Sequence, residues 1–350
     1  MSTINDINSL LDTALDGVDT TAAELSDNTA SVELMPVPED GIDLRLKRMS
    51  YSSTLTLHAC PRRYQLDKLQ AIANPIDDIS QQVTFDYGHV VGQGIQDALD
   101  GLDDTTIYMN AFLDMWSGDL LAELPRKKKS FWYAMAAIKR FIALREQGYL
   151  NEYELLYVDG KPAVELGFKI IMPDGFTYRG FVDAILVHKH TGQVVVLELK
   201  TTGSNNINSA QYKNSAQAIG YSIVLDFLVP DVNAYTVLYL IYSSTSLEYT
   251  ELPFDKSYYQ RALWLRDLQI DREHVAQYCS YGDHFPMRGE SCYDFFTECK
   301  YLSLCQMDTD TLIKLLTVTE YERMVKEDED KYPYVVTFEQ LVESQLSREI

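Results

Sequence analysis

Charged residues interrupt two apolar, strand-like segments between residues 177 and 200, and this feature constrains the fold of the chain most. The first segment contains Asp183, and the second contains Glu198 and Lys200. An ionised group inside an apolar strand costs free energy unless a partner compensates its charge. Glu198 and Lys200 are two residues apart, so their side chains point to the same face of a strand. We expect the strands to pair through the Thr191-Gly192 turn and to bring the three charges together.

The remaining pattern predicts an α/β chain of the α+β type. A helix is expected from Ser52 or Ser53, the candidate caps, to about residue 69, and Pro61 predicts a kink or a restart within it. Further helices are expected at 95–102, directly after a glycine-rich run, and at 130–147, 208–227 and 257–278. Strands are expected at 153–158, 163–171, 177–188, 193–200, 235–242 and 247–252, and the first four predict an antiparallel meander.

Acidic residues are concentrated toward the ends of the chain, which has 52 Asp and Glu, 30 Lys and Arg, and a formal net charge of -22. We predict an acidic flexible tail at 1–45, one folded domain at 46–310 and an acidic helical extension at 311–350. The acidic tails are candidate docking segments for a partner protein. The charge argues against a broad basic surface for nucleic acid, although local basic groups occur at 62–68, 126–129 and 139–140.

The chain lacks the marks of a membrane or secreted protein. It has no apolar run of 18 residues, and its first residues lack a basic segment followed by an apolar stretch. We therefore expect no membrane partner and a location in the cytoplasm of a bacterial or phage-infected cell. Five cysteines in such a compartment favour metal or cluster ligation over a disulfide framework.

The spacing of the three central charges suits metal-assisted chemistry. Mg²⁺ and similar ions prefer oxygen ligands, often one or two carboxylates with phosphate oxygens and water. An ion held by Asp183 and Glu198, with the carbonyl of Leu199 as a further ligand, activates water and stabilises charge on a phosphate. Lys200 is then placed to orient or deprotonate that water, or to neutralise the phosphate. The alternative is a buried Glu–Lys pair with Asp183 at a strand end and no metal.

Four short motifs and a set of cysteines occur in a fixed order along the chain. The motifs are Cys60-Pro61-x-x-Tyr64, Gly180-x-x-Asp183, Glu198-x-Lys200 and Gln217-x-x-x-Tyr221, and the cysteines follow near the end. This order resembles the RecB-like branch of the PD-(D/E)XK nucleases over residues 50 to 306. The resemblance implies a restriction-endonuclease-like core, with a central mixed sheet flanked by helices, and a helical lobe closed by a C-terminal cysteine cluster.

The resemblance also implies roles for individual residues. Asp183 and Glu198 hold the metal and Lys200 assists the water, while Gln217 and Tyr221 contact DNA or order the catalytic residues. Gln217 and Tyr221 are four residues apart and share a helix face, which an ordinary surface pair also does.

The sequence departs from the family at a histidine that often supplies another metal ligand. In the family's Gly-x-x-x-His pattern, counted from Gly88, that position is Gly92. His89 is the nearby histidine. Either the histidine ligand is absent, which we expect, or the register differs and His89 is the ligand. Glu165, in the first long strand, is a further acid that could help at the site, but we favour a solvated strand residue.

Cys60, Cys292, Cys299 and Cys305 supply four thiols, enough for a 4Fe–4S cluster or a structural Zn²⁺. The last two are separated by five residues, which resembles the iron–sulfur nucleases of the RecB-like group, including AddB-like proteins and CRISPR-associated exonucleases. The alternative is four buried, reduced cysteines. We expect Cys279 to be a plain buried thiol.

The function expected from these features is an Mg²⁺- or Mn²⁺-dependent deoxyribonuclease. The resemblance implies an exonuclease acting on DNA ends or single strands, phage- or CRISPR-linked, in recombination, replication or DNA processing. The alternative is a catalytically inactive module that binds DNA or a partner protein and keeps a structural four-cysteine site. A small-molecule enzyme is disfavoured because no phosphate-binding glycine loop follows a strand and no His-Glu-x-x-His motif occurs.

Overall fold

The computed structural model of the chain describes residues 48–69, 79–115, 127–228, 235–281, 285–294, 297–307 and 332–346. The predicted tail at 1–45 and most of the predicted extension at 311–350 lie outside these ranges. The chain divides into two compact units. We call residues 77–167 and 181–257 the central unit, and the residues before, between and after them the flanking unit. In the described part of the chain, no helix is both long and apolar enough to cross a membrane.

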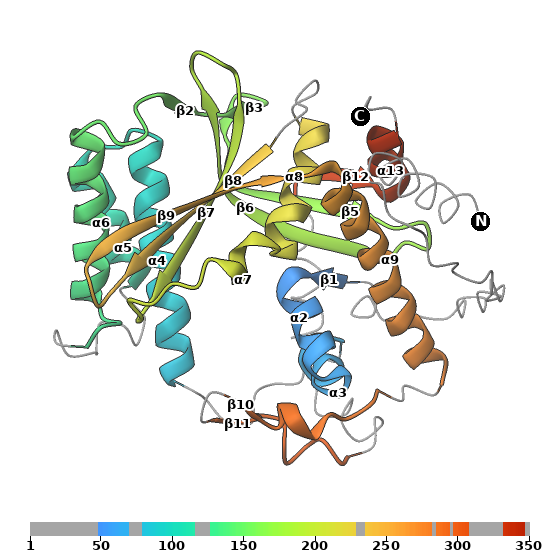
Figure 1. Cartoon of the computed structure of the whole chain (residues 1–350). Coiled ribbons are helices and arrows are strands. Elements are labelled where there is room, and N and C mark those ends of the chain that lie inside the picture. The colour runs from blue at the N-terminus through green and yellow to red at the C-terminus, as the bar shows by residue number, and fades with distance from the viewer. Residues whose placement is uncertain are drawn as a thin grey trace. The chain divides into compact units, whose positions relative to one another are not determined.

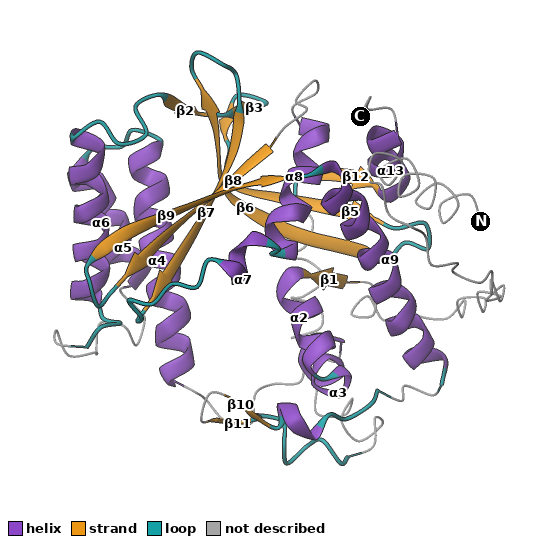
Figure 2. Cartoon of the chain, viewed as in Figure 1, coloured by secondary structure: helices purple, strands orange, loops and turns teal. Residues whose placement is uncertain are grey.

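The helices and strands follow the predicted order (Figure 2). The helices are α2 (Tyr51–Ala59), α3 (Pro61–Tyr64), α4 (Ile79–Leu99), α5 (Asp104–Met115), α6 (Phe131–Glu146), α7 (Ala210–Lys213), α8 (Ala216–Leu228), α9 (Tyr258–Ser280) and α13 (Phe338–Leu346). The strands are β1 (Arg48–Ser50), β2 (Tyr153–Leu155), β3 (Tyr157–Val158), β4 (Lys161–Pro162), β5 (Val164–Ile171), β6 (Thr177–His188), β7 (Val194–Thr202), β8 (Tyr235–Ser243), β9 (Glu248–Lys256), β10 (Tyr293–Asp294), β11 (Thr297–Glu298) and β12 (Tyr334–Thr337).

The sheet of the central unit is mixed, as predicted. Strand β7 pairs antiparallel with β6 and parallel with β8, and β9 returns antiparallel along β8. Strand β2 pairs antiparallel with β6. The predicted meander is therefore wrong in one respect, because β2 does not pair with the long strand that follows it in the sequence. The chain inserts the short hairpin β3–β4 between them, and β2 is left to pair across the sheet.

One face of this sheet is covered by α4, α5 and α6, which Figure 1 draws side by side. The apolar residues of these helices form one buried core with alternate residues of the strands, including Val195 and Leu197 of β7. Because successive side chains of a strand point to opposite faces, Glu198 and Lys200 are directed away from this core. Helix α8 contacts β7 and β8, and it carries Gln217 toward that other face. The apolar pattern of β7 therefore determines which face receives the charged residues.

The flanking unit contains its own strands and helices. Strand β1 pairs parallel with the first residues of β6, and β12 pairs parallel with the last residues of β5. A strand at Tyr334–Thr337 was not expected within the predicted helical extension. The helix break at Pro61 is confirmed, since α2 ends at Ala59 and α3 begins at Pro61. The predicted cap is wrong by two or three residues: Ser50 caps α2 and forms a reciprocal capping box with Ser53.

Helix α4 differs from the prediction because it continues through the glycine-rich run instead of beginning after it. Gly88, Gly92 and Gly94 all lie inside the helix. Glycine weakens a helix on its own, but tertiary packing overrides this preference. At Gly94 the reason is visible, since a Cβ there would lie 2.5 Å from Cδ1 of the fully buried Ile138 on α6. The glycine lets α4 and α6 approach closely.

We predict opposite effects for two alanine substitutions on this helix. Gly94→Ala is expected to lower the free energy of unfolding by about 1–3 kcal/mol, because Cδ1 and Cγ1 of the fully buried Ile138 would have to shift. Gly92→Ala, where a Cβ meets nothing within 4 Å, is expected to raise it by up to about 1 kcal/mol through helix propensity. Denaturant unfolding of both variants, and partial rescue of Gly94→Ala by Ile138→Val, checks the argument. Equal effects of the two substitutions would contradict it.

Candidate active site

Adjacent strands β6 and β7 bring Asp183 and Glu198 together. Ala184 pairs with Leu197, so the next cross-strand neighbours, one position farther from the turn at 191–192, are Asp183 and Glu198. The regular pairing of β6 with β7 ends at Ala184, and one carboxylate oxygen of Asp183 accepts a hydrogen bond from the backbone N–H of Leu199 at 2.7 Å. This bond holds the Asp183 carboxylate against β7.

Lys200 links the carboxylates to helix α8. Its Nζ lies 2.5 Å from Oε1 of Glu198 and donates to Oε1 of Gln217 at 3.2 Å. Gln217 in turn donates from Nε2 to the hydroxyl of Tyr221 at 2.8 Å, across one helical turn. The structure thus joins the sequence-predicted residues Glu198, Lys200, Gln217 and Tyr221 in one hydrogen-bonded chain. A chain of this kind fixes the position of the ammonium group.

Burial sets the electrostatics of this group. Burial raises the pKa of Asp183 well above 3.8, and the neighbouring carboxylate of Glu198 raises it further, against the effect of Lys200. Burial also raises the pKa of Glu198 above 4.5, although the bonded Lys200 opposes the rise. Burial lowers the pKa of Lys200, but Glu198 and Asp183 outweigh it and the net shift is upward. Lys200 is therefore a firmly charged ammonium between two carboxylates that burial disfavours as anions.

The residues fit a divalent metal ion. Glu198 is 0% exposed, and its Oε2 has no hydrogen-bond partner within the described residues. A buried oxygen without a partner is rare and costly. A cation bound between Glu198 and Asp183 would supply the missing partner and favour both carboxylates as anions. Among the described residues, no group of three His, Cys, Asp or Glu side chains is arranged to hold a metal ion, either around Glu198 or among the four cysteines. An ion at Asp183 and Glu198 would therefore be completed by water and phosphate.

Gln96 and Glu165 also belong to this site. The sequence analysis missed Gln96, and it named Glu165 as an acid that could help at the site while favouring a solvated residue. Gln96 is buried, and its Nε2 donates to Oε1 of Glu165 at 3.0 Å and to the carbonyl of Asp183 at 2.9 Å. Glu165 raises the pKa of both Asp183 and Glu198 electrostatically. It is exposed, as expected, but its backbone φ is +44°, an unusual value for a non-glycine residue. The strained backbone directs a third acidic side chain toward the site.

The histidine position of the family pattern explains how Gln96 could have been found. Gly92 has no side chain to offer, and His89 is exposed on α4. Gln96 lies one helical turn after Gly92 on the same face, and it contacts the site. The sequence feature that could have identified Gln96 is its position, four residues after Gly92. This spacing places Gln96 on the same face as Gly92 only if residues 88–96 form a single helix.

The cysteine segments meet within the flanking unit. The side chain of Arg62 donates from Nε to the carbonyl of Cys305 at 3.2 Å and from Nη2 to that of Met307 at 2.6 Å. The backbone N–H of Cys299 donates to the carbonyl of Cys292 at 2.8 Å. Burial raises the pKa of Cys305 against the effect of Arg62, and the other three thiols, of Cys60, Cys292 and Cys299, raise it further. All four are free thiols.

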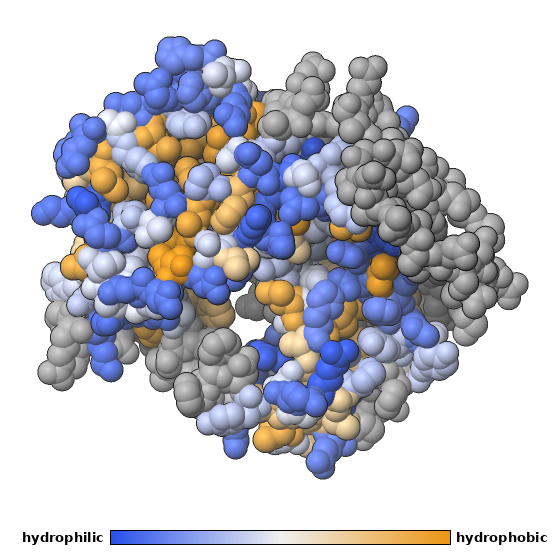
Figure 3. Space-filling model, viewed as in Figure 1, coloured by the Kyte–Doolittle hydropathy of each residue, from blue (hydrophilic) through white to orange (hydrophobic). Residues whose placement is uncertain are grey.

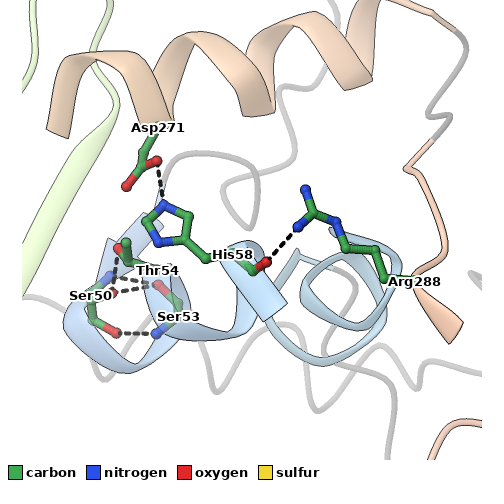
Figure 4. A network of polar contacts seen from close by, with 6 residues as sticks. All are labelled: Ser50, Ser53, Thr54, His58, Asp271 and Arg288. Carbon is green, nitrogen blue, oxygen red and sulfur yellow. Dashed lines mark hydrogen bonds and ion pairs between the residues drawn. The ribbon is translucent and has the colours of Figure 1, made fainter. Parts of the chain in front are cut away.

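Further contacts hold helix α2 in this arrangement (Figure 4). Nε2 of His58 lies 2.7 Å from Oδ1 of Asp271 on α9. Arg288 donates to the carbonyl of His58 at 3.0 Å, and Ser291 donates to that of Ala59 at 2.6 Å. The last carbonyls of α2 are thereby satisfied by the cysteine-bearing segment, which places Cys60 beside it.

The comparisons with known proteins decide the family. The family model of the PD-(D/E)XK nuclease superfamily matches residues 48–306. The chain belongs to the PD-(D/E)XK nuclease superfamily. Among solved structures, this superfamily member is similar to a putative exonuclease from Eubacterium rectale, with 10% identity, a TM-score of 0.44, and coverage of 77% of this chain and 92% of that chain. It is also similar to SSO0001, with 12% identity, a TM-score of 0.25, and coverage of 80% and 84%. No curated protein matches the chain.

We predict that Asp183→Asn stabilises the metal-free protein. The folded-state pKa of Asp183 is raised, so its ionisation destabilises the fold once the pH exceeds the unfolded value of about 3.8. Asparagine keeps an acceptor for the N–H of Leu199 and removes the charge. With a chelator present, we expect the variant to melt about 3 °C or more above the wild type at pH 8. The melting temperatures of the variant and the wild type should become equal near pH 4. A difference in melting temperature that does not change with pH would contradict the argument.

Proposed function

We propose that this nuclease-superfamily chain is an Mg²⁺- or Mn²⁺-dependent deoxyribonuclease that acts as an exonuclease. One observation carries the proposal: the buried Glu198, with one oxygen unpartnered, lies beside Asp183 and Lys200 on adjacent strands. Structural ion pairs are normally satisfied, because an unpartnered buried charge is costly. A site kept in this condition needs a ligand. We infer that Asp183 and Glu198 hold the metal, with the carbonyl of Leu199 as a further ligand.

When bound, the metal lowers the pKa of a water molecule and neutralises charge that develops on the phosphate. The chain's own residues position the other reactants. Against the effect of burial, the carboxylates of Glu198 and Asp183 raise the pKa of Lys200, and its ammonium is placed to donate hydrogen bonds to the attacking water or to the phosphate. Gln217 and Tyr221 keep Lys200 directed toward the carboxylates. Gln96 holds the strand at Asp183 and orients Glu165 beside it.

The finer features of the proposal rest on the ordered motifs. The RecB-like order of Cys60, Asp183, Lys200 and Tyr221 supports an enzyme that degrades DNA from its ends in recombination, replication or phage and CRISPR-linked processing. The competing function is a catalytically inactive module that binds DNA or protein. The intact chain of charges from Asp183 to Lys200 disfavours that alternative, since its burial costs stability and brings a binding module no benefit.

We further propose that Cys60, Cys292, Cys299 and Cys305 hold a 4Fe–4S cluster, with Zn²⁺ as the alternative occupant. The support is the hydrogen bonding that joins residues 58–62 to the cysteine-bearing segment, and the other three thiols of the set lie close enough to Cys305 to raise its pKa. A bound cluster would link α2 to the end of the described nuclease domain and would contribute to its stability.

Lys200→Ala is predicted to lower the turnover number by about 100-fold or more while leaving oligonucleotide affinity within a few-fold, because the ammonium acts on the reacting groups. The measurement is degradation of end-labelled DNA with Mn²⁺ and with chelator. Lys161→Ala, which alters an exposed lysine of β4, is the matched control and should retain full activity. Wild-type protein that degrades no DNA with either metal would favour the inactive module.

The purified protein is predicted to be brown, with an absorption band near about 400 nm and bound iron and sulfide. Cys299→Ser should remove the band and lower the melting temperature, whereas Cys279→Ser, outside the set of four, should change neither. Colourless protein containing one zinc ion would identify the alternative occupant. Protein with neither metal, whose stability is unaffected by Cys299→Ser, would refute the four-cysteine site.

A further inference from the structure

We propose that Lys127, Lys128, Lys129 and Trp132, here called the lysine–tryptophan strip, bind unpaired nucleotides of the strand that enters the active site. The proposal rests on the proposed nuclease function and specifies its substrate as single-stranded DNA. The strip lies in the central unit, where α6 begins, and it belongs to the same unit as the catalytic carboxylates.

Among the described residues, no acidic side chain neutralises these lysines. Lys127 and Lys128 are exposed, and in the described part of the chain none of the three lysines forms an ion pair. Their hydrogen bonds are to hydroxyls: Lys128 to Thr245 at 2.7 Å and Lys129 to Thr84 at 3.1 Å. Arg140, farther along α6, is instead paired with Glu248. In a chain of net charge -22, three adjacent uncompensated lysines are a local attraction for phosphates.

Trp132 adds an exposed and oriented aromatic face. Its side chain is 56% exposed, and its ring packs edge-to-face on Phe131, with centroids 5.5 Å apart. Phe131 in turn contacts Phe112 of α5 edge-to-face at 6.0 Å. In Figure 3, hydrophobic residues reach the surface among hydrophilic ones on the side where Figure 1 draws α5 and α6. An open aromatic ring beside lysines is the combination that binds single strands, since bases stack on the ring while lysines follow the phosphates.

The end of strand β7 connects the strip to the active site. Gly203 follows Lys200 by three residues, about 10 Å along a strand. The carbonyl of Gly203 accepts a hydrogen bond at 2.6 Å from Thr245, which is also the partner of Lys128. The neighbouring carbonyl of Thr202 accepts from the backbone N–H of Ser244 at 2.9 Å. A DNA strand that leaves the catalytic residues along the end of β7 therefore contacts Lys128 before the other residues of the lysine–tryptophan strip.

The aromatic ring favours single strands over duplexes. In a duplex the bases stack on one another and show no free face to Trp132, so a duplex contacts the lysines alone. An unpaired strand gains from both kinds of contact. The strip thereby accounts for selection of a strand with free bases by a protein whose overall charge repels DNA.

The test is binding of fluorescent oligo(dT) to the full chain in chelator, where no cleavage occurs. The double variant Lys127→Glu, Lys128→Glu should weaken binding at least 10-fold and reduce the slope of log affinity against log salt by about 0.7 per lysine. Trp132→Leu should weaken binding by about 5- to 100-fold for oligo(dT) and leave binding of a blunt duplex unchanged. The matched control, Lys161→Glu with Lys189→Glu, changes the charge equally at two other exposed positions and should bind within about 2-fold of the wild type.

Two further measurements separate stacking from misfolding. Trp132→Phe keeps an aromatic face, so it should keep most of the affinity while losing part of the tryptophan quenching that oligo(dT) causes. A melting temperature equal to that of the wild type shows that a variant is folded. If the Lys127→Glu, Lys128→Glu variant fails this check, the double variant Lys127→Ala, Lys128→Ala takes its place. If the strip variants bind like the control, the strip proposal is overturned even when the wild type cleaves DNA. If the strip variants lose binding but the wild type cleaves nothing with Mn²⁺, the strip stands and the nuclease proposal falls.

Discussion

Glu198 is fully buried, and within the described residues only one of its two oxygens is hydrogen-bonded, so the chemistry of the central unit depends on this half-compensated carboxylate. Its position follows from the apolar alternation of β7, which directs Leu197 to the helices and Glu198 to the other face. Lys200 compensates one oxygen, and Asp183 adds a second negative charge across the strand pair. The fold thus maintains an arrangement that is unfavourable in isolation and becomes favourable when a cation enters.

The site depends on helix packing far from the carboxylates. Gly94 lets α4 approach α6 closely at Ile138, and this approach places Gln96, two residues later, beside the carbonyl of Asp183. Gln96 also bonds Glu165, whose left-handed backbone is sustained only by its surroundings. A cavity or clash between α4 and α6 would therefore displace Gln96 and, through it, the carboxylates of Asp183 and Glu165. Stability of the helical layer and chemistry at the site are coupled through a single glutamine.

The local parts of this arrangement could be predicted from the sequence, and the non-local parts could not. Asp183, Glu198 and Lys200 stand out because charges inside apolar strands need an explanation, and Gln217 and Tyr221 follow from helical spacing. Gln96 was missed because three closely spaced glycines disfavour a helix, so α4 was predicted to begin after them. In the structure, packing of α4 against Ile138 overrides this preference of glycine. Strand β12, more than 160 residues after β5, was missed because parallel pairing at long range leaves no local pattern.

The net charge of the chain gains a physical meaning once the basic residues are located. A nuclease with a broad basic surface holds duplex DNA along its length, whereas a chain of charge -22 repels DNA except where cations are uncompensated. In the proposed complex two such places are the metal between Asp183 and Glu198 and the lysines that precede α6. Glu198 precedes Gly203 by five residues, about 17 Å along a strand. Gly203 bonds the Thr245 hydroxyl that Lys128 also contacts, so the span suits a few unpaired nucleotides at an end. Acidity outside the site then acts in favour of selectivity, because it removes the nonspecific binding that would compete with capture of a strand end.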